Sequence, residues 1–220
     1  MLPPPASRDG RRERTKAANR AAILGAARAV FAERGYEASA VRDIVRRTEL
    51  APGTFYNYFP DKESIFRALV EDSIAGVRER LREARREARS IEEFVGGAYS
   101  AYFAAMAGDP TMFQLMRRNA GTIRAMLDDP VLAAGVGELL EDLESAIERG
   151  ELPPHDARYM ARAMAGAGLE IAMEMFDRPG DPDVAGASAF ATALFLGGIE
   201  RMATPAGAAG AHPNGRAPAV

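Results

Sequence analysis

The chain has 220 residues and a net charge of −3, and its 47% hydrophobic content is typical of a globular protein with room for one large domain or two smaller ones. It contains no cysteine, so disulfides and thiolate metal sites are excluded. No run approaches the roughly 18 apolar residues of a membrane span, and the charged N-terminus lacks the apolar centre of a secretory signal. We therefore expect a cytoplasmic protein with no membrane partner.

The charges are unevenly distributed along the chain. Residues 1–62 carry 12 Lys and Arg against 7 Asp and Glu, whereas residues 63–220 carry 16 against 24. Because affinity for DNA depends on local cationic contacts, this pattern favours an anionic partner for the first part only. A solvated charged helix would give the same bias.

Residues 1–12 are rich in proline and then in arginine, and we expect them to form a disordered basic arm. Such an arm can follow a DNA backbone or enter the minor groove, although an unstructured terminus without a partner fits equally well. Residues 13–34 have the period of an amphipathic helix, whose apolar face is formed by Ile23, Ala27, Val30 and Phe31. Gly35 is placed to end this helix.

Residues 41–59, VRDIVRRTELAPGTFYNYF, predict two short helices joined by a tight turn, which is a helix-turn-helix. Ser39 is placed to cap the first helix. Pro52 fits the first position of the second helix, where its missing N–H costs nothing. Phe55 and Phe59 lie four residues apart and should pack inward. The other side chains of the second helix then face the major groove of DNA.

The DNA-facing side of this second helix is expected to consist of Thr54, Tyr56, Asn57 and Tyr58. Gly53 leaves the helix start bare, so that a phosphate can approach backbone N–H groups. Pro60 breaks the helix and Asp61 caps the next one. Lys62, in the first turn of that helix, is available to a phosphate.

From residue 63 to residue 203 the pattern predicts further helices and no strand, so the fold class is all-α. This gives a DNA-binding domain over 13–62, a second domain over 63–203, and an Ala/Gly/Pro-rich tail over 204–220 that should be disordered. The charge run RERLREARREAR, at 78–89, fits a solvated helix face better than a second nucleic-acid site.

The second domain carries a candidate ligand cavity. Nine of the ten methionines lie beyond residue 100, among several aromatic residues. Adaptable Met-rich surface suits a flexible hydrophobic ligand, but methionines at helical spacing also form ordinary core. The candidate ligand-binding residues are Tyr102, Phe103, Met106, Phe113, Met116, Met164 and Met175.

The stretches AAILGAARAVFAERGYEASAVRDIV and GTFYNYFPDKESIF resemble the first four helices of TetR/AcrR-type transcriptional repressors, from about Ala22 to Leu69. The resemblance implies a ligand-responsive repressor that binds a palindromic operator as a homodimer and is nucleoid-associated when bound. It implies a dimer interface through the last two helices, at about 156–176 and 182–202, whose Ala and Gly residues permit close packing. It places DNA contacts at Gly53, Thr54, Tyr56, Asn57, Tyr58 and Lys62, and backbone contacts at Ser39 and Arg42.

Three residues depart from the pattern of that family. Glu49 replaces a usual glycine in the turn, and a left-handed conformation there would cost about 1 kcal/mol. Ala51 replaces a usual hydroxyl cap, at a cost of about 1 kcal/mol. Val45 replaces a usual alanine at the helix crossing. We expect a normal fold with a slightly altered angle of the DNA-reading helix.

The stretch Met116–Glu144 resembles the ligand domain of one TetR subgroup, which represses unsaturated fatty-acid synthesis and senses long-chain acyl-CoA or acyl-carrier thioesters. That resemblance adds Arg117 to the candidate ligand-binding residues. Arg117, together with Arg118 and Arg124, would then contact the phosphates of the ligand. Surface or interdomain salt bridges are the simpler expectation for these three arginines.

Other classes of function fit less well. The chain has no GxSxG, HExxH, Walker or GxGxxG pattern, and only two histidines, His155 and His212, so we expect no enzyme, cofactor or metal site. A repressor that senses drugs or other xenobiotics and controls an efflux or catabolic operon is the first alternative. A helical protein-interaction module without DNA binding is a more distant one.

Overall fold

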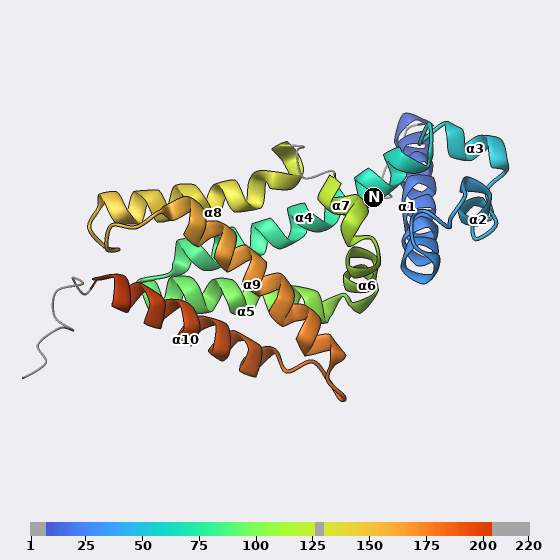
Figure 1. The fold of residues 1–220 in the computed structure, drawn as a ribbon. Helices are drawn as coiled ribbons and strands as arrows, with labels where there is room; N and C mark the ends of the chain where they lie inside the picture. Colours follow the sequence, from blue (N-terminus) through green and yellow to red (C-terminus); the bar gives the residue numbers. More distant parts are fainter. Residues whose placement is uncertain (1–7, 126–129, 204–220) are drawn as a thin grey trace, which may run out of the picture.

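Residues 8–125 and 130–203 are described by the computed structural model, and within these ranges the chain forms ten helices and no strand. A small head lies at one end of a larger helical body, and α4 runs from the head into the body (Figure 1). The all-α prediction is therefore confirmed. The helices are α1 Arg8–Arg34, α2 Val41–Val45, α3 Pro52–Tyr56, α4 Lys62–Glu87, α5 Ile91–Gly108, α6 Pro110–Arg118, α7 Ala120–Ala125, α8 Pro130–Glu148, α9 Ala157–Asp177 and α10 Val184–Ala203.

The head is built around large buried side chains of α1 to α4. Aromatic rings supply most of this core, and Phe31 meets Phe66 edge-on at 5.3 Å between ring centroids. The predicted inward residues Phe55 and Phe59 are buried in it. Gly35 ends α1 with φ +83°, the left-handed conformation that glycine adopts most easily.

Helix α1 begins at Arg8, five residues before the start predicted from the apolar period. Residues 8–12 are therefore helical, and the prediction of a disordered arm over 1–12 was wrong for them. The apolar stripe that locates a helix in the sequence is absent here, because residues 11–18 are all exposed. Residues 1–7 and the tail at 204–220 lie outside the described residues.

The start of α2 and the turn after it differ from the prediction. The residue at the N-cap is Ala40, whose N–H donates to Asp43 Oδ2 at 3.0 Å. Ser39 does not cap α2; it is buried, and its hydroxyl donates to the Gly35 carbonyl at 2.5 Å. Among the described residues only glycines have positive φ, so the expected left-handed strain at Glu49 does not occur. Ala51 begins α3 without a side-chain cap, as expected.

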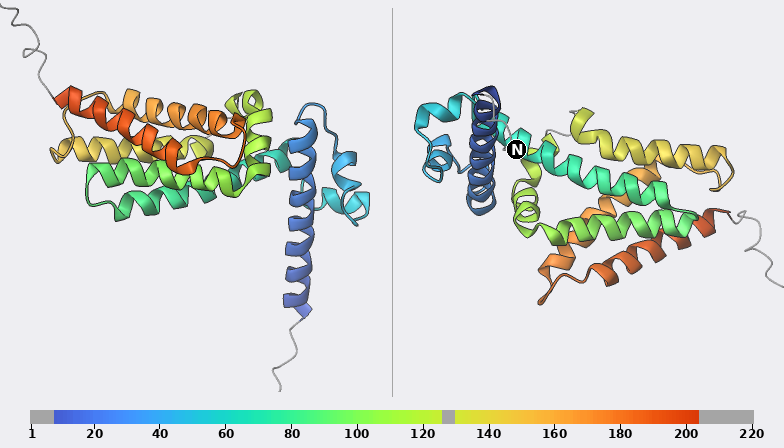
Figure 2. Two further views of the ribbon diagram at one scale, coloured as in Figure 1. Left: turned by 90° about the horizontal axis from the view of Figure 1, so that it is seen from below. Right: turned by 180° about the vertical axis from the view of Figure 1, so that it is seen from behind.

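The body consists of α4, α5, α8, α9 and α10, with α5 packed against both α4 and α10 and α8 packed against α9 (Figure 1; Figure 2). Short polar side chains begin several of its helices, which satisfies backbone N–H groups that have no partner within the helix. Ser90 accepts from Glu93 N at 3.1 Å, and Asp156 accepts from Tyr159 N at 3.1 Å. No helix in the described ranges combines the length and apolar character needed to cross a bilayer.

Helices α6 and α7 connect the body to the head. Met112, Leu115 and Ile123 are buried in the same apolar cluster as the head residues of α1 and α4. The predicted division at residues 62 and 63 thus runs through a shared core. Asp109 reinforces this contact, because it caps α6 by accepting from Met112 N and also forms an ion pair with Arg28 of α1.

Candidate nucleic-acid interface and ligand cavity

Helix α3 presents one large aromatic side chain to solvent. Tyr56 is 59% exposed, and its ring meets the buried Phe55 edge-on at 5.3 Å. Gly53 and Asn57 are also exposed, and Thr54 is half-buried. The helix is only five residues long and ends at Tyr56, so Asn57 and Tyr58 follow it in a turn rather than in the longer helix that the sequence predicted.

The rest of the predicted DNA-binding set lies around α3 with different exposures. Arg42 is exposed on α2, whereas Ser39 is buried. Tyr58 is half-buried, and its hydroxyl accepts from Asn19 Nδ2 of α1 at 3.1 Å. The predicted residues therefore lie in one region of the head, but they do not all face solvent.

Lys62 is held within the head. Its ammonium group donates to the Tyr36 carbonyl at 2.8 Å and lies 4.0 Å from the centroid of the Tyr36 ring. The half-buried ammonium has three N–H donors, so this bond occupies one of them. The contact fixes the cation at the start of α4, beside α3.

The body contains a cavity of about 620 Å³, within the usual size range of small-molecule sites. It lies among α4, α5, α6, α8 and α9, and most of its wall is apolar. Burial of Tyr102 raises the pKa of its hydroxyl to about 12. The predicted ligand-binding residues that line the cavity are Tyr102, Met106, Phe113, Met116, Arg117 and Met164.

Two predicted ligand-binding residues do not line the cavity. Phe103 is fully buried and stacks on Tyr99, with 5.8 Å between ring centroids. Met175 is buried in the same core cluster. The sequence pattern correctly places both on inward faces, but it does not separate the core from a cavity within that core.

Sequence reasoning missed the contribution of α4 and α8 to the cavity wall. Ser73, Val77 and Leu81 extend the apolar face of α4 past the end of the head, and all three line the cavity. Val136 and Leu139 of α8 face them. The signal was present in the sequence, because this face of α4 continues for more turns than the head needs.

One wall of the cavity is cationic. Arg78 and Arg85 of α4 line it, and both pair with Glu138 of α8. Only 6% of the Arg85 side chain is exposed, and its Nε lies 2.6 Å from Asp142 Oδ2. The prediction that residues 78–89 form a solvated helix face was therefore wrong for Arg85.

Glu138 is the carboxylate at the centre of this charged group. Burial would raise its pKa, but hydrogen bonds from Arg78 and Arg82 outweigh burial and hold the pKa below its usual range. Within the described residues, Arg78 Nε and Glu138 Oε2 are buried without a hydrogen-bond partner. The arrangement joins α4 to α8 and leaves guanidinium groups beside an apolar space.

The arginines of α6 link segments of the protein. Arg117 lines the cavity and pairs with Asp177 at 2.7 Å. Arg118 donates to the Glu33 carbonyl of α1. The side chain of Arg124 lies outside the described residues. Asn119 is buried next to them, and its Oδ1 accepts from the Tyr36 backbone N–H at 2.6 Å.

Comparison with known proteins agrees with the helix-turn-helix geometry. Residues 23–69 match the family model of bacterial regulatory proteins, tetR family. Over these residues the chain is similar to the TetR family. TetR-family proteins are DNA-binding transcription regulators, and the head and helical body have the TetR-type arrangement.

Similar TetR-family proteins are known from bacilli. The fatty acid metabolism regulator protein of Bacillus subtilis (strain 168) is 29% identical over 143 residues, which is 58% of this chain and 74% of the relative. FadR from Bacillus halodurans superimposes with a TM-score of 0.71 at 25% identity, covering 82% of this chain and 95% of that one. FadR from Bacillus subtilis in complex with stearoyl-CoA gives a TM-score of 0.71 at 26% identity, covering 81% of this chain and 98% of that one.

Proposed function

We propose that this protein is a transcriptional repressor that binds a palindromic operator as a homodimer and is released by a long-chain fatty acyl-CoA. The carrying observation is the cavity, which shares α4 and α6 with the contact between body and head, is lined mostly with apolar side chains and has guanidinium groups in its wall. An acyl chain matches the apolar space, and the phosphates of CoA match the guanidinium groups. The FadR structure in complex with stearoyl-CoA supports this ligand class, and the similarity to a fatty acid metabolism regulator agrees with it.

The proposed DNA contacts are made by the exposed side of α3 and the residues around it. Tyr56, Asn57 and Arg42 would meet the duplex directly, and Lys62 would offer its remaining N–H donors to a phosphate. Thr54 and Gly53 would lie against the backbone. The named relatives are regulators, so we infer a binding protein rather than an enzyme. A repressor of this kind works in the cytoplasm, on the nucleoid when bound.

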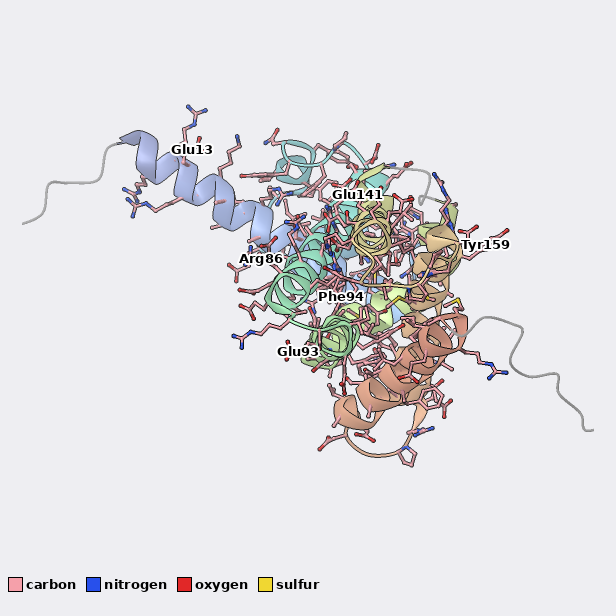
Figure 3. The ribbon with its side chains drawn as sticks, turned by 90° about the vertical axis from the view of Figure 1, so that its left-hand side faces the viewer. Glu13, Arg86, Glu93, Phe94, Glu141 and Tyr159 are labelled. Atoms are coloured by element: carbon pink, nitrogen blue, oxygen red, sulfur yellow. The ribbon has the colours of Figure 1, made fainter. Side chains whose placement is uncertain are left out.

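The proposed homodimer uses the outer faces of α9 and α10. Apolar side chains there lack a partner in the single chain: Tyr159 is 77% exposed and Phe190 62%. Tyr159 lies at the outer edge of α9 in Figure 3. Exposed small residues surround them, including Ala163, Gly166, Ala193 and Gly197. A two-fold axis through these helices would set two α3 helices toward successive major grooves.

Release of DNA would depend on α6. Met112, Phe113 and Met116 of this helix line the cavity, and Met112 and Leu115 are buried in the head core, against which Met116 also packs. A ligand that displaces these cavity-lining side chains would move Leu115 and the head core with them. It then favours a conformer in which the two heads no longer match both half-sites, and the DNA affinity falls.

The test is fluorescence anisotropy of the full chain on duplex DNA from its own upstream region, titrated with stearoyl-CoA or free CoA. We expect tight, salt-sensitive binding that stearoyl-CoA weakens and free CoA does not. Binding that ignores stearoyl-CoA but responds to planar cationic drugs would assign the cavity to a xenobiotic sensor. Absence of salt-sensitive binding to any genomic duplex would refute the repressor and favour a protein-interaction module.

A further inference from the structure

The N-terminal part of α1 projects from the head as a helix without an apolar face. Residues 11–18 are all exposed, and this segment extends well past α2, α3 and the body (Figure 2; Figure 3, where Glu13 marks it). A helix that is polar on every side gains little from packing, so its sequence is not explained by the fold. We call residues 11–20 the basic extension.

The basic extension carries five cations, Arg11, Arg12, Arg14, Lys16 and Arg20, and the single acid Glu13. Three other arginines of the head are paired with acids: Arg28 with Asp109, Arg34 with Asp43 and Arg47 with Glu33. In contrast, Arg11, Arg12 and Lys16 form no ion pair within the described part of the chain. Their charge is available to an external partner.

The basic extension starts beside the DNA-reading residues. Asn19 donates to the Tyr58 hydroxyl at 3.1 Å, and the Arg20 guanidinium lies 5.5 Å from the centroid of the Phe59 ring. Arg12, Lys16 and Asn19 follow the i, i+4, i+7 spacing, so they share one face of α1. That face therefore continues outward from Tyr58 as a stripe of cations.

We propose that the Arg12–Lys16 face binds the phosphate backbone of the operator duplex outside the half-site that α3 reads. This inference rests on the DNA-binding role proposed above. From Asn19 to Arg12 the helix rises about 10 Å, which matches about three base pairs of DNA. An α-helix is about 10 Å wide with its side chains and does not fit a minor groove of about 6 Å. The contact is therefore with the backbone and independent of sequence.

The test compares two double variants of the full chain that remove equal charge from opposite faces of the extension. Arg12→Ala with Lys16→Ala removes the face that continues from Asn19. Arg11→Ala with Arg14→Ala removes the other face and serves as the control. Alanine has the highest helix propensity, so circular dichroism should show an unchanged helix content in both.

The measured quantity is the slope of log binding constant against log salt concentration, on the upstream duplex and on the same duplex trimmed at the outer edge of the half-sites. On the longer duplex we expect Arg12→Ala/Lys16→Ala to reduce the slope by about two ions per protomer and the control pair to leave it unchanged. On the trimmed duplex the slope of the wild type should fall by the same two ions per protomer. The slope of Arg12→Ala/Lys16→Ala should not change when the duplex is trimmed.

Equal slopes for all three proteins would overturn the proposal, and so would equal losses in the two double variants, because those would report net charge alone. Binding of the extension to anionic lipid vesicles with no effect on the DNA slope would assign it to a membrane surface instead. These outcomes differ from failure of the proposed function, in which the wild type itself shows no salt-sensitive binding to any duplex.

Discussion

At the scale of single residues, Tyr56 is the side chain whose position fits DNA recognition best. Its ring lies on a five-residue helix whose neighbouring side chain, Phe55, already fills the core. Exposure of a large aromatic residue at this point is not explained by packing. The exposed part of the side chain can offer a hydroxyl for hydrogen bonds and ring surface for apolar contacts with bases.

We expect Tyr56→Ala to weaken operator binding by at least tenfold and to leave the melting temperature and the oligomeric state unchanged. A base or backbone contact of this kind contributes about 1–3 kcal/mol, and loss of an exposed side chain has little effect on folding. Anisotropy and thermal unfolding measure the two effects. Tyr56→Phe separates the ring from the hydroxyl, and undiminished affinity in the alanine variant would show that another face of the head meets DNA.

At the scale of helices, the sequence predicted the elements well wherever an apolar stripe meets a strong end signal. Gly35 follows the end of α1 and Asp61 caps α4, both where expected. The prediction from the sequence failed where the apolar stripe or the end signal is missing, as at the polar start of α1. It also missed the break at Asn119, because what ends α6 there is a tertiary contact with Tyr36 rather than a local breaker.

The candidate sites were predicted in part for a related reason. Residue spacing identifies which side chains point inward, so Tyr102, Met106 and Met164 were found, but Phe103 was included with them. Spacing on α4 also could not reveal that Arg85 turns toward α8, since its acidic partners lie more than 50 positions away in the sequence. Whether an inward-facing residue lies in the core, lines a cavity or forms an ion pair depends on how the helices pack against one another.

Asn119 couples α6 to the head. Asn119→Ala would leave the partly buried Tyr36 N–H without its acceptor, and we expect it to reduce the free energy of unfolding by about 1–2 kcal/mol. It should also reduce the difference in DNA affinity between ligand-free and stearoyl-CoA-bound protein. Urea unfolding and anisotropy provide the measurements. Gln114→Ala, on the exposed side of α6, is the control, and equal effects of the two substitutions would argue against the coupling.

Glu138 links α4 to α8 in a pH-dependent way. Because its pKa is lowered in the folded protein, its contribution to stability is complete above the unfolded pKa of about 4.3 and is lost as the pH falls through the lower, folded value. We expect Glu138→Gln to destabilise the protein by roughly 1–2 kcal/mol at neutral pH. In urea unfolding, the difference in the free energy of unfolding between wild type and Glu138→Gln should narrow below about pH 4.

The exposed Glu141 on the same helix supplies the comparison for that experiment. Glu141→Gln should unfold like the wild type at neutral and acidic pH. The free energy of unfolding of Glu138→Gln could instead differ from that of the wild type by the same amount at every pH. The substitution would then act through packing and not through the charge of the carboxylate.

At the scale of the whole molecule, two copies of the chain must be held in a fixed relation for two α3 helices to read one operator. Leu194→Arg places a charge on the exposed apolar face of α10, and we expect a shift from dimer to monomer in sedimentation velocity. Operator affinity should fall with it, since each half-site alone binds weakly. Ala104→Arg, at an exposed position on α5, should stay dimeric. A dimeric Leu194→Arg protein would place the interface elsewhere.

The burial of Met112, Leu115 and Ile123 in the core of the head has a consequence for recombination between regulators. A hybrid protein that joins this head to the ligand domain of another family member at residue 62 would replace these three side chains together with Phe66 and Val70. It would leave Phe31 and Phe55 packed against foreign side chains. Helices α6 and α7 would have to be inherited together with the head. DNA specificity and ligand specificity in this protein are thus exchangeable only along a boundary that follows the packing rather than the order of the chain.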